Sequence, residues 1–144
     1  MTKLSAFTQL YLRISIATGY LVFGLDRLGV LGKNGEKNVS WGDWEHFIKY
    51  ASEVMSFLPH SLINLFAVIA TVAEILFGTL LLLGKWTRAA AYGSALLALL
   101  YAISMGISYG ITSPLAYSVF TLSAASLLLA QQSYYNWSLD ALNK

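Results

Sequence analysis

The sequence predicts an all-α integral membrane protein, built as a bundle of four transmembrane helices with an additional amphipathic helix between the first two. Of the 144 residues, 57% are hydrophobic and 11% are charged, against about 25% charged residues in a typical soluble domain. The hydrophobic residues form long runs rather than the spaced pattern of a soluble core, and one polar segment separates the first run from the second. We therefore expect residues 1–144 to form a single transmembrane domain.

The first hydrophobic run covers residues 4–25 and predicts a helix that crosses the bilayer. At a rise of 1.5 Å per residue, about 22 residues are long enough for a hydrocarbon core of about 30 Å. A cleaved signal peptide is the competing interpretation. It is disfavoured because the run is too long for the hydrophobic region of a signal peptide and carries Arg13 in its middle.

The second and third runs, residues 62–83 and 88–111, predict an antiparallel pair of transmembrane helices. Gly84 directly follows the second run, and glycine suits the left-handed conformation that closes many helices. The connection that carries Lys85 and Arg88 is long enough only for a tight turn. These two helices are therefore expected to lie side by side.

The fourth predicted helix covers residues 114–131. Ser113 is a suitable N-terminal cap and Pro114 suits the first helical position. Trp86 lies in the preceding turn between helices two and three, and Trp137 belongs to an aromatic cluster that follows helix four. Because tryptophan concentrates at membrane interfaces, we expect Trp86 and Trp137 to be interfacial anchors.

Residues 41–58 predict the amphipathic helix, because their apolar residues recur at spacings of three and four. Trp41, Trp44 and Phe47 belong to this apolar face, and we expect them to anchor the segment at the membrane interface. The helix would lie flat on the bilayer or cover the mouth of the bundle. A short soluble helix packed on loop residues is the disfavoured alternative.

The distribution of cations predicts the orientation. Lys and Arg near membrane ends in short loops mark the cytoplasmic side, and the turn with Lys85 and Arg88 is the densest such signal. With an even number of spans, both termini are expected on that side. The predicted location is a bacterial-type inner (cytoplasmic) membrane, as a multi-pass protein.

Two charged residues inside the runs, Arg13 and Glu74, are the best candidates for a functional site. Each costs about 2.5–3.5 kcal/mol on insertion scales unless it finds a partner. Arg13 stands nine residues after the start of its run and Glu74 nine before the end of its own, which predicts equal depth and a direct contact. The pair would either clamp two helices or bind a ligand in a polar pocket. The candidate pocket residues are the nearby polar side chains Gln9, Tyr20, Tyr101, Ser104, Ser108, Tyr117 and Thr121.

The sequence also excludes several classes of function. The net charge of +2 without a basic cluster argues against nucleic-acid binding. The absence of cysteine excludes thiolate metal sites and iron–sulfur ligation by this chain. His46 and His60 lie outside the runs with no second-ligand spacing, so no metal site is expected.

Residues 12–14, 24–28 and especially 74–90 resemble the DoxX-like family of small four-helix membrane proteins. The last stretch pairs the intramembrane Glu74 with Gly78 and the basic turn. The family usually has Lys where Arg27 stands, which retains the charge. The resemblance implies a four-helix membrane fold, and relatives of this kind include a subunit of a thiosulfate:quinone oxidoreductase, redox-partnered bacterial membrane proteins and animal proteins that assist receptor assembly.

Two functions follow as hypotheses. In the first, the protein is a redox-associated membrane subunit whose Arg13 and Glu74 meet a quinone headgroup or an anionic substrate, with no cofactor held by the chain itself and a redox protein as partner. In the second, it is a non-enzymatic assembly factor or scaffold for another membrane protein. Whether the chain is an enzyme stays open, as does homo-oligomerisation. The lipid bilayer is a partner in both hypotheses.

Overall fold

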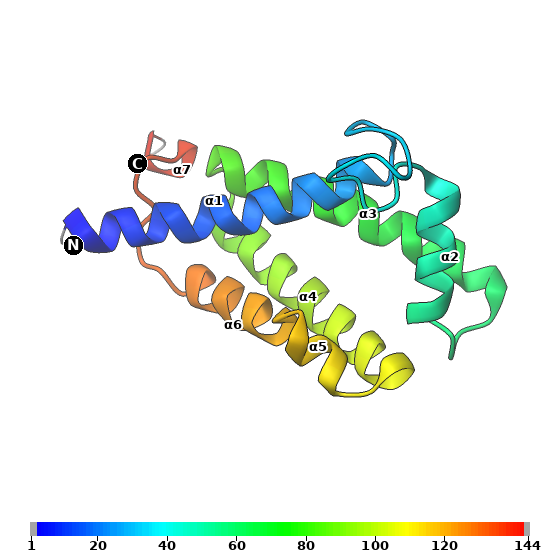
Figure 1. Ribbon diagram of the computed structural model, residues 1–144. Coiled ribbons are helices and arrows are strands. Elements are labelled where there is room, and N and C mark those ends of the chain that lie inside the picture. The colour runs from blue at the N-terminus through cyan, green and yellow to red at the C-terminus, as the bar shows by residue number, and fades with distance from the viewer. Residues whose placement is uncertain (1–2, 143–144) are drawn as a thin grey trace.

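The computed structural model describes residues 3–142 and is all-α across them, as predicted. No strand occurs in this part of the chain. The helices are α1 (Lys3–Asp26), α2 (Trp44–Val54), α3 (His60–Leu83), α4 (Thr87–Tyr109), α5 (Thr112–Ala116), α6 (Val119–Ala130) and α7 (Leu139–Leu142), as Figure 1 shows.

The long helices pack in two pairs, α1 beside α3 and α4 beside α6 (Figure 1). A tight turn joins α3 to α4 and therefore joins the two pairs at one end of the molecule. Both ends of the described chain lie at that same end, while α2 packs on α3 and α4 at the opposite end (Figure 1).

The side chains are distributed as in a membrane protein. The interior is lined by small residues that are at most 1% exposed, among them Ala17, Ala67, Ala91, Ala98, Ala102 and Ala130. Large apolar side chains at least half exposed cover the outside, among them Leu65, Val72, Leu76, Leu96, Ile107 and Leu128. Lipid tails are as apolar as leucine, so membrane helices approach one another through small residues and leave large ones facing lipid.

Two of the helices, α3 and α4, are long and apolar enough to cross a membrane by length and composition. Helix α1 has 24 residues, but its mean hydropathy is lower than that of a typical membrane-crossing helix. Helix α6 is apolar but has only 12 residues. The structure thus supports the predicted hairpin as a membrane-crossing unit. Spans by the first and fourth predicted helices stay a prediction.

The prediction of one continuous helix over residues 114–131 is wrong. The backbone adopts a left-handed conformation at Ser118, with φ of 55°, and divides the segment into α5 and α6. The Ser118 N–H bonds back to the Leu115 carbonyl at 3.0 Å, which closes a tight turn. Helix α6 then packs on α4, where the Ser123 hydroxyl donates to the Ala95 carbonyl at 2.8 Å.

Helix α2 is shorter than predicted, and its apolar face contacts protein. The helix begins at Trp44 after Asp43, whose carboxylate accepts the His46 N–H at 2.9 Å. Phe47 is only 6% exposed and packs with Ala51 against α3. Phe47 is therefore a core residue, and its prediction as a lipid anchor is wrong. Of the two predicted uses of this helix, covering the bundle is the one the packing supports.

Candidate functional site

A buried ion pair joins the end of α1 to the middle of α3. The Arg27 Nη2 atom lies 2.8 Å from the Glu74 Oε2 atom, and both side chains are 4% exposed. The Tyr101 hydroxyl, from α4, donates to the other oxygen of Glu74 at 2.6 Å. One carboxylate thus contacts a guanidinium and a phenol and connects α1, α3 and α4.

Two more donors of Arg27 are also held in place. Its Nη1 atom donates to the Thr71 hydroxyl at 3.1 Å, and its Nε atom donates to the Phe23 carbonyl at 3.0 Å. Thr71 lies one turn before Glu74 on α3, so both contact the guanidinium from one helix face. Such fixed geometry suits a buried charge, which is stable only when its hydrogen bonds are made.

Two aromatic rings cover the guanidinium, and we call Trp41 and Phe47 the aromatic lid. The central carbon of Arg27 lies 4.0 Å from the centroid of the Phe47 ring and 5.1 Å from that of the Trp41 ring. The two rings meet edge to face with centroids 5.2 Å apart. These are cation–π distances, and the lid separates the ion pair from the outside of the bundle.

Asp26, the neighbour of Arg27 in the chain, fixes the segment that carries the lid. Its carboxylate is 2% exposed and accepts the backbone N–H groups of Ser40 at 3.2 Å and of Trp41 at 2.8 Å. Consecutive residues at the end of α1 therefore have complementary roles. Asp26 holds the lid segment, and Arg27 binds Glu74 beneath it.

The predicted contact between Arg13 and Glu74 is wrong. Arg13 donates to the carbonyls of Trp137 at 2.6 Å and Asn136 at 3.4 Å, and its guanidinium lies against Gly84, at the end of α3. The reason is the stagger of the helices, because α1 extends beyond the end of α3 (Figure 1). Equal distances from helix ends consequently do not give equal depths.

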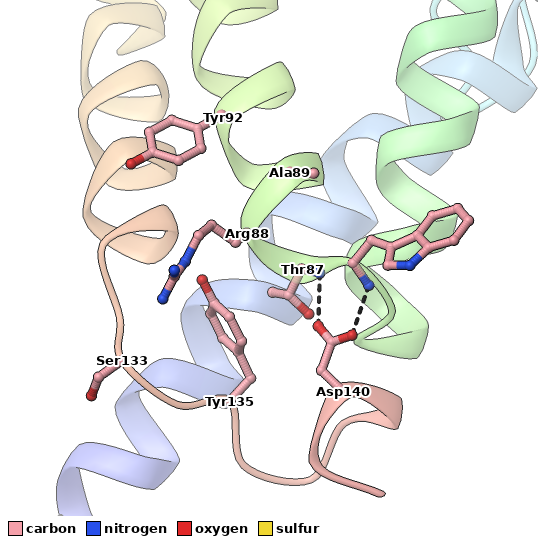
Figure 2. Close-up of a pocket in the computed structure, with 8 residues that line it drawn as sticks. Thr87, Arg88, Ala89, Tyr92, Ser133, Tyr135 and Asp140 are labelled. Atoms are coloured by element: carbon pink, nitrogen blue, oxygen red, sulfur yellow. Dashed lines mark hydrogen bonds between the residues drawn. The ribbon is translucent and has the colours of Figure 1, made fainter. Parts of the chain in front are cut away.

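Arg13 and Gln9 instead hold the segment that follows α6. Gln9 donates to the Tyr134 carbonyl and accepts the Asn136 N–H, the latter at 2.9 Å. We call this arrangement, completed by Asp140, the C-terminal clasp. The carboxylate of Asp140 accepts the N–H groups of Trp86 and Thr87, each at 2.8 Å, at the start of α4 (Figure 2).

The charge of Asp140 is favoured in this position. Partial burial opposes its ionisation, but the hydrogen bonds from Thr87 and Trp86 and the positive charge of Arg13 outweigh burial and lower the pKa of Asp140 below its usual value. The clasp is thus a structural contact between the two ends of the chain.

The other predicted pocket residues make no hydrogen bond to Glu74 in the described part of the chain. Tyr20 is buried and donates to the Ser94 carbonyl at 2.7 Å, Ser108 donates to the Val54 carbonyl at 2.7 Å, and Ser104 is half-buried on α4. Tyr117, directly after α5, and Thr121, on α6, are exposed, so their assignment to a midplane pocket is wrong. Of the predicted set, Tyr101 is the residue that contacts Glu74 in the described chain.

The tryptophans predicted as interfacial anchors lie in two different environments. Trp86 is 66% exposed and Trp137 is 63% exposed at the end of the bundle that holds both chain ends, so both are free to meet lipid headgroups. Trp44 is half-buried and donates from its ring to the Asn64 side chain at 3.2 Å, which ties α2 to α3.

Sequence reasoning missed Arg27, Thr71 and Asp26 as site residues. A signal for Arg27 was present, since it stands at the end of the first run in one of the stretches that carry the family resemblance. Among residues 3–142, no cluster of three or more side chains that could hold a metal ion occurs.

Comparison with known protein families places the chain in one of them. A family model described as DoxX matches residues 8–107, a range that contains Arg27, Glu74 and Tyr101. No curated protein and no solved structure matches the chain.

Proposed function

The chain belongs to the DoxX family of membrane proteins, and we propose that it serves a membrane redox reaction as the subunit that binds a quinone at Arg27, Glu74 and Tyr101. The observation that supports this proposal is the sharing of one buried carboxylate between a guanidinium 2.8 Å away and a phenol 2.6 Å away. Glu74 lies within the apolar helix α3, and an ionisable group in a membrane helix is by default a candidate for a functional site.

The chemistry of a quinone fits these groups. Reduction to the quinol takes up equal numbers of electrons and protons, and a partner redox protein would supply the electrons. Arg27 would donate hydrogen bonds to a quinone carbonyl, and Glu74 with Tyr101 would pass to its oxygens the two protons that they take up from water. Because the aromatic lid covers the pair, a headgroup reaches it when Trp41 and Phe47 move aside.

We further propose that the protein crosses a bacterial-type inner membrane with four spans and both termini in the cytoplasm. Both ends of the described chain lie at the same end of the bundle, as an even number of spans requires (Figure 1). The turn with Lys85 and Arg88 lies between α3 and α4 at that end, which supports the cytoplasmic assignment by the positive-inside rule.

A role as an assembly factor or scaffold is the second candidate. The observation that favours it is the closure of the site: Arg27 and Glu74 are each 4% exposed, and their charges are satisfied within the protein. A pair of this kind could serve only to lock α1, α3 and α4 into the shape that a client protein recognises.

Binding of a short-chain ubiquinone to the purified protein in nanodiscs tests the first proposal. Trp41 lies beside the ion pair, so quenching of its fluorescence reports a bound headgroup. We expect saturable quenching that Glu74→Gln and Arg27→Met weaken at least about tenfold, the loss of one charge-assisted contact. Glu45→Gln is the matched control, because Glu45 is an exposed carboxylate on α2.

The fluorescence must also be assigned to the correct ring. Trp41→Phe should remove the saturable part of the quenching, whereas Trp137→Phe should retain it, since Trp137 belongs to the segment that Arg13 holds and not to the aromatic lid. Identical, unsaturable quenching in all variants would show only partition of the quinone into lipid. That result would favour the scaffold.

A further inference from the structure

We propose that the hollow around Arg88, at the end of the bundle away from the ion pair, binds the phosphate of an anionic phospholipid. The hollow has a volume of about 720 Å³ and is open to the surface. It is lined by residues of the turn, of α4 and of the segment after α6, namely Trp86, Thr87, Arg88, Ala89, Tyr92, Ser133, Tyr135 and Asp140 (Figure 2). This inference is independent of the quinone proposal.

Arg88 is placed to receive an anion. Its Nη2 atom donates to the Gln132 carbonyl at 3.0 Å, and its guanidinium lies beside the Tyr135 ring in the hollow (Figure 2). No carboxylate lies within 4.0 Å of it in the described chain. A guanidinium has five N–H donors in a planar fork that matches phosphate oxygens, so donors remain for a ligand.

The acidic residue in the lining does not neutralise Arg88. Both oxygens of Asp140 accept backbone N–H groups at the start of α4. Its negative charge is therefore stabilised by the N-terminal end of this helix and by Arg13. Lys85 adds a second cation on the adjacent turn. A zwitterionic headgroup would bring its own ammonium group close to Arg88, so an anionic lipid is favoured.

The helix face below Arg88 has the polarity profile of a lipid. Arg88, Tyr92 and Leu96 follow one another at intervals of four residues on α4, about 6 Å apart along the helix axis. This order of charge, amphipathic ring and exposed leucine matches the order of phosphate, glycerol and acyl chain. Ala89 has a small side chain and leaves room for the headgroup, and the neighbouring Trp86 is 66% exposed.

The test measures lipid binding to the full chain in nanodiscs of phosphatidylcholine with increasing phosphatidylglycerol, read by thermal stability and by native mass spectrometry. Arg88→Gln is compared with Lys85→Gln, which removes the same charge three residues away. Lys85 is exposed, lies over the Trp86 ring and does not line the hollow. A second variant, Ala89→Leu, fills the hollow without changing the charge.

We expect Arg88→Gln to weaken phosphatidylglycerol binding by roughly fivefold or more, and Ala89→Leu to weaken it comparably. Lys85→Gln should have the smaller effect. Inorganic phosphate added to pure phosphatidylcholine nanodiscs should not stabilise the protein, because a free ion lacks the acyl chains that hold the headgroup in place. Equal losses for Arg88→Gln and Lys85→Gln, with no effect of Ala89→Leu, would show a diffuse attraction to the membrane surface and overturn the proposal. Stabilisation by inorganic phosphate alone would overturn the assignment to lipid.

Discussion

The guanidinium of Arg27 and the carboxylate of Glu74 lie 2.8 Å apart at the point where the end of α1, the middle of α3 and the aromatic lid meet. Burial makes the two charges interdependent. Each is stable in the interior because the other is present, and the removal of one leaves an uncompensated buried charge. This interdependence can be measured.

Arg27→Met and Glu74→Leu should each destabilise the protein by about 3–5 kcal/mol, whereas the double variant should be close to wild type in stability. The reason is that the double variant replaces both charges by apolar groups of similar size. Thermal unfolding of the three variants in detergent gives the coupling energy. If the double variant folds but no longer binds a quinone, the pair has a role beyond clamping helices.

Arg13 provides the matched control for this cycle. It contacts the carbonyls of Asn136 and Trp137 and not Glu74, so Arg13→Met and Glu74→Leu should have additive effects within about 0.5 kcal/mol. A strong rescue of Glu74→Leu by Arg13→Met would show that the pairing described above is wrong.

Local signals in the sequence predicted the hairpin of α3 and α4. Gly84 ends α3 in the left-handed conformation, with φ of 67°, and its N–H bonds back to the Leu81 carbonyl. Glycine at this position and the short basic turn are features of a few adjacent residues, which is why they can be read from the sequence. Glu74 was identified for the same reason, as a charge within an apolar run.

The partner of Glu74 could not be derived in this way, because it depends on the axial offset between α1 and α3. Nothing local encodes that stagger. The periodicity of residues 41–58 likewise shows which face of α2 is apolar, but not that Phe47 packs on Arg27 rather than on lipid. The helix is broken at Ser118, which is neither glycine nor proline, so the sequence gives no local signal for this break.

The four-span topology predicts that the loop between α1 and α2 and the end of α6 face opposite sides of the membrane. The chain has no cysteine, so single cysteines at Lys37 and at Gln131, both exposed, give clean labelling sites. In oriented membranes, an impermeant maleimide should label Lys37→Cys from the periplasmic side and Gln131→Cys from the cytoplasmic side. Labelling of both from one side would contradict the odd number of spans, α3, α4 and α6, between these two positions and would contradict the four-span arrangement with it.

The C-terminal clasp should open in acid. The pKa of Asp140 is lower in the folded protein than in the unfolded chain, where a carboxyl titrates near about 3.9. The charged form therefore stabilises the clasp fully above about pH 4, and this contribution is lost as the pH falls through the lowered pKa. The amide NMR signals of Trp86 and Thr87, which donate to this carboxylate, should shift in that window. Asp140→Asn should abolish the transition, and an unchanged transition in that variant would assign it to another group.

Asp26 should control the opening of the aromatic lid. Its two oxygens accept the N–H groups of Ser40 and Trp41, and an asparagine has only one oxygen with which to replace them. Asp26→Asn should therefore leave one buried N–H without a partner, at a cost of about 1–3 kcal/mol, most of which acts on the lid segment and not on the whole bundle.

Hydrogen exchange of the Ser40 and Trp41 amides measures this opening directly. Because about 1.4 kcal/mol corresponds to a factor of ten in an equilibrium constant, exchange should become roughly tenfold faster in Asp26→Asn. Glu45→Gln, an exposed carboxylate paired only with Lys49 across one helical turn, should leave the exchange unchanged. If the lid also controls access to Arg27 and Glu74, Asp26→Asn should bind a quinone faster than wild type while the ion pair stays intact. Faster exchange without faster binding would mean that Asp26 holds the segment of Ser40 and Trp41 in place but does not control access to the ion pair. A quinone would then reach Glu74 between the helices rather than beneath the lid.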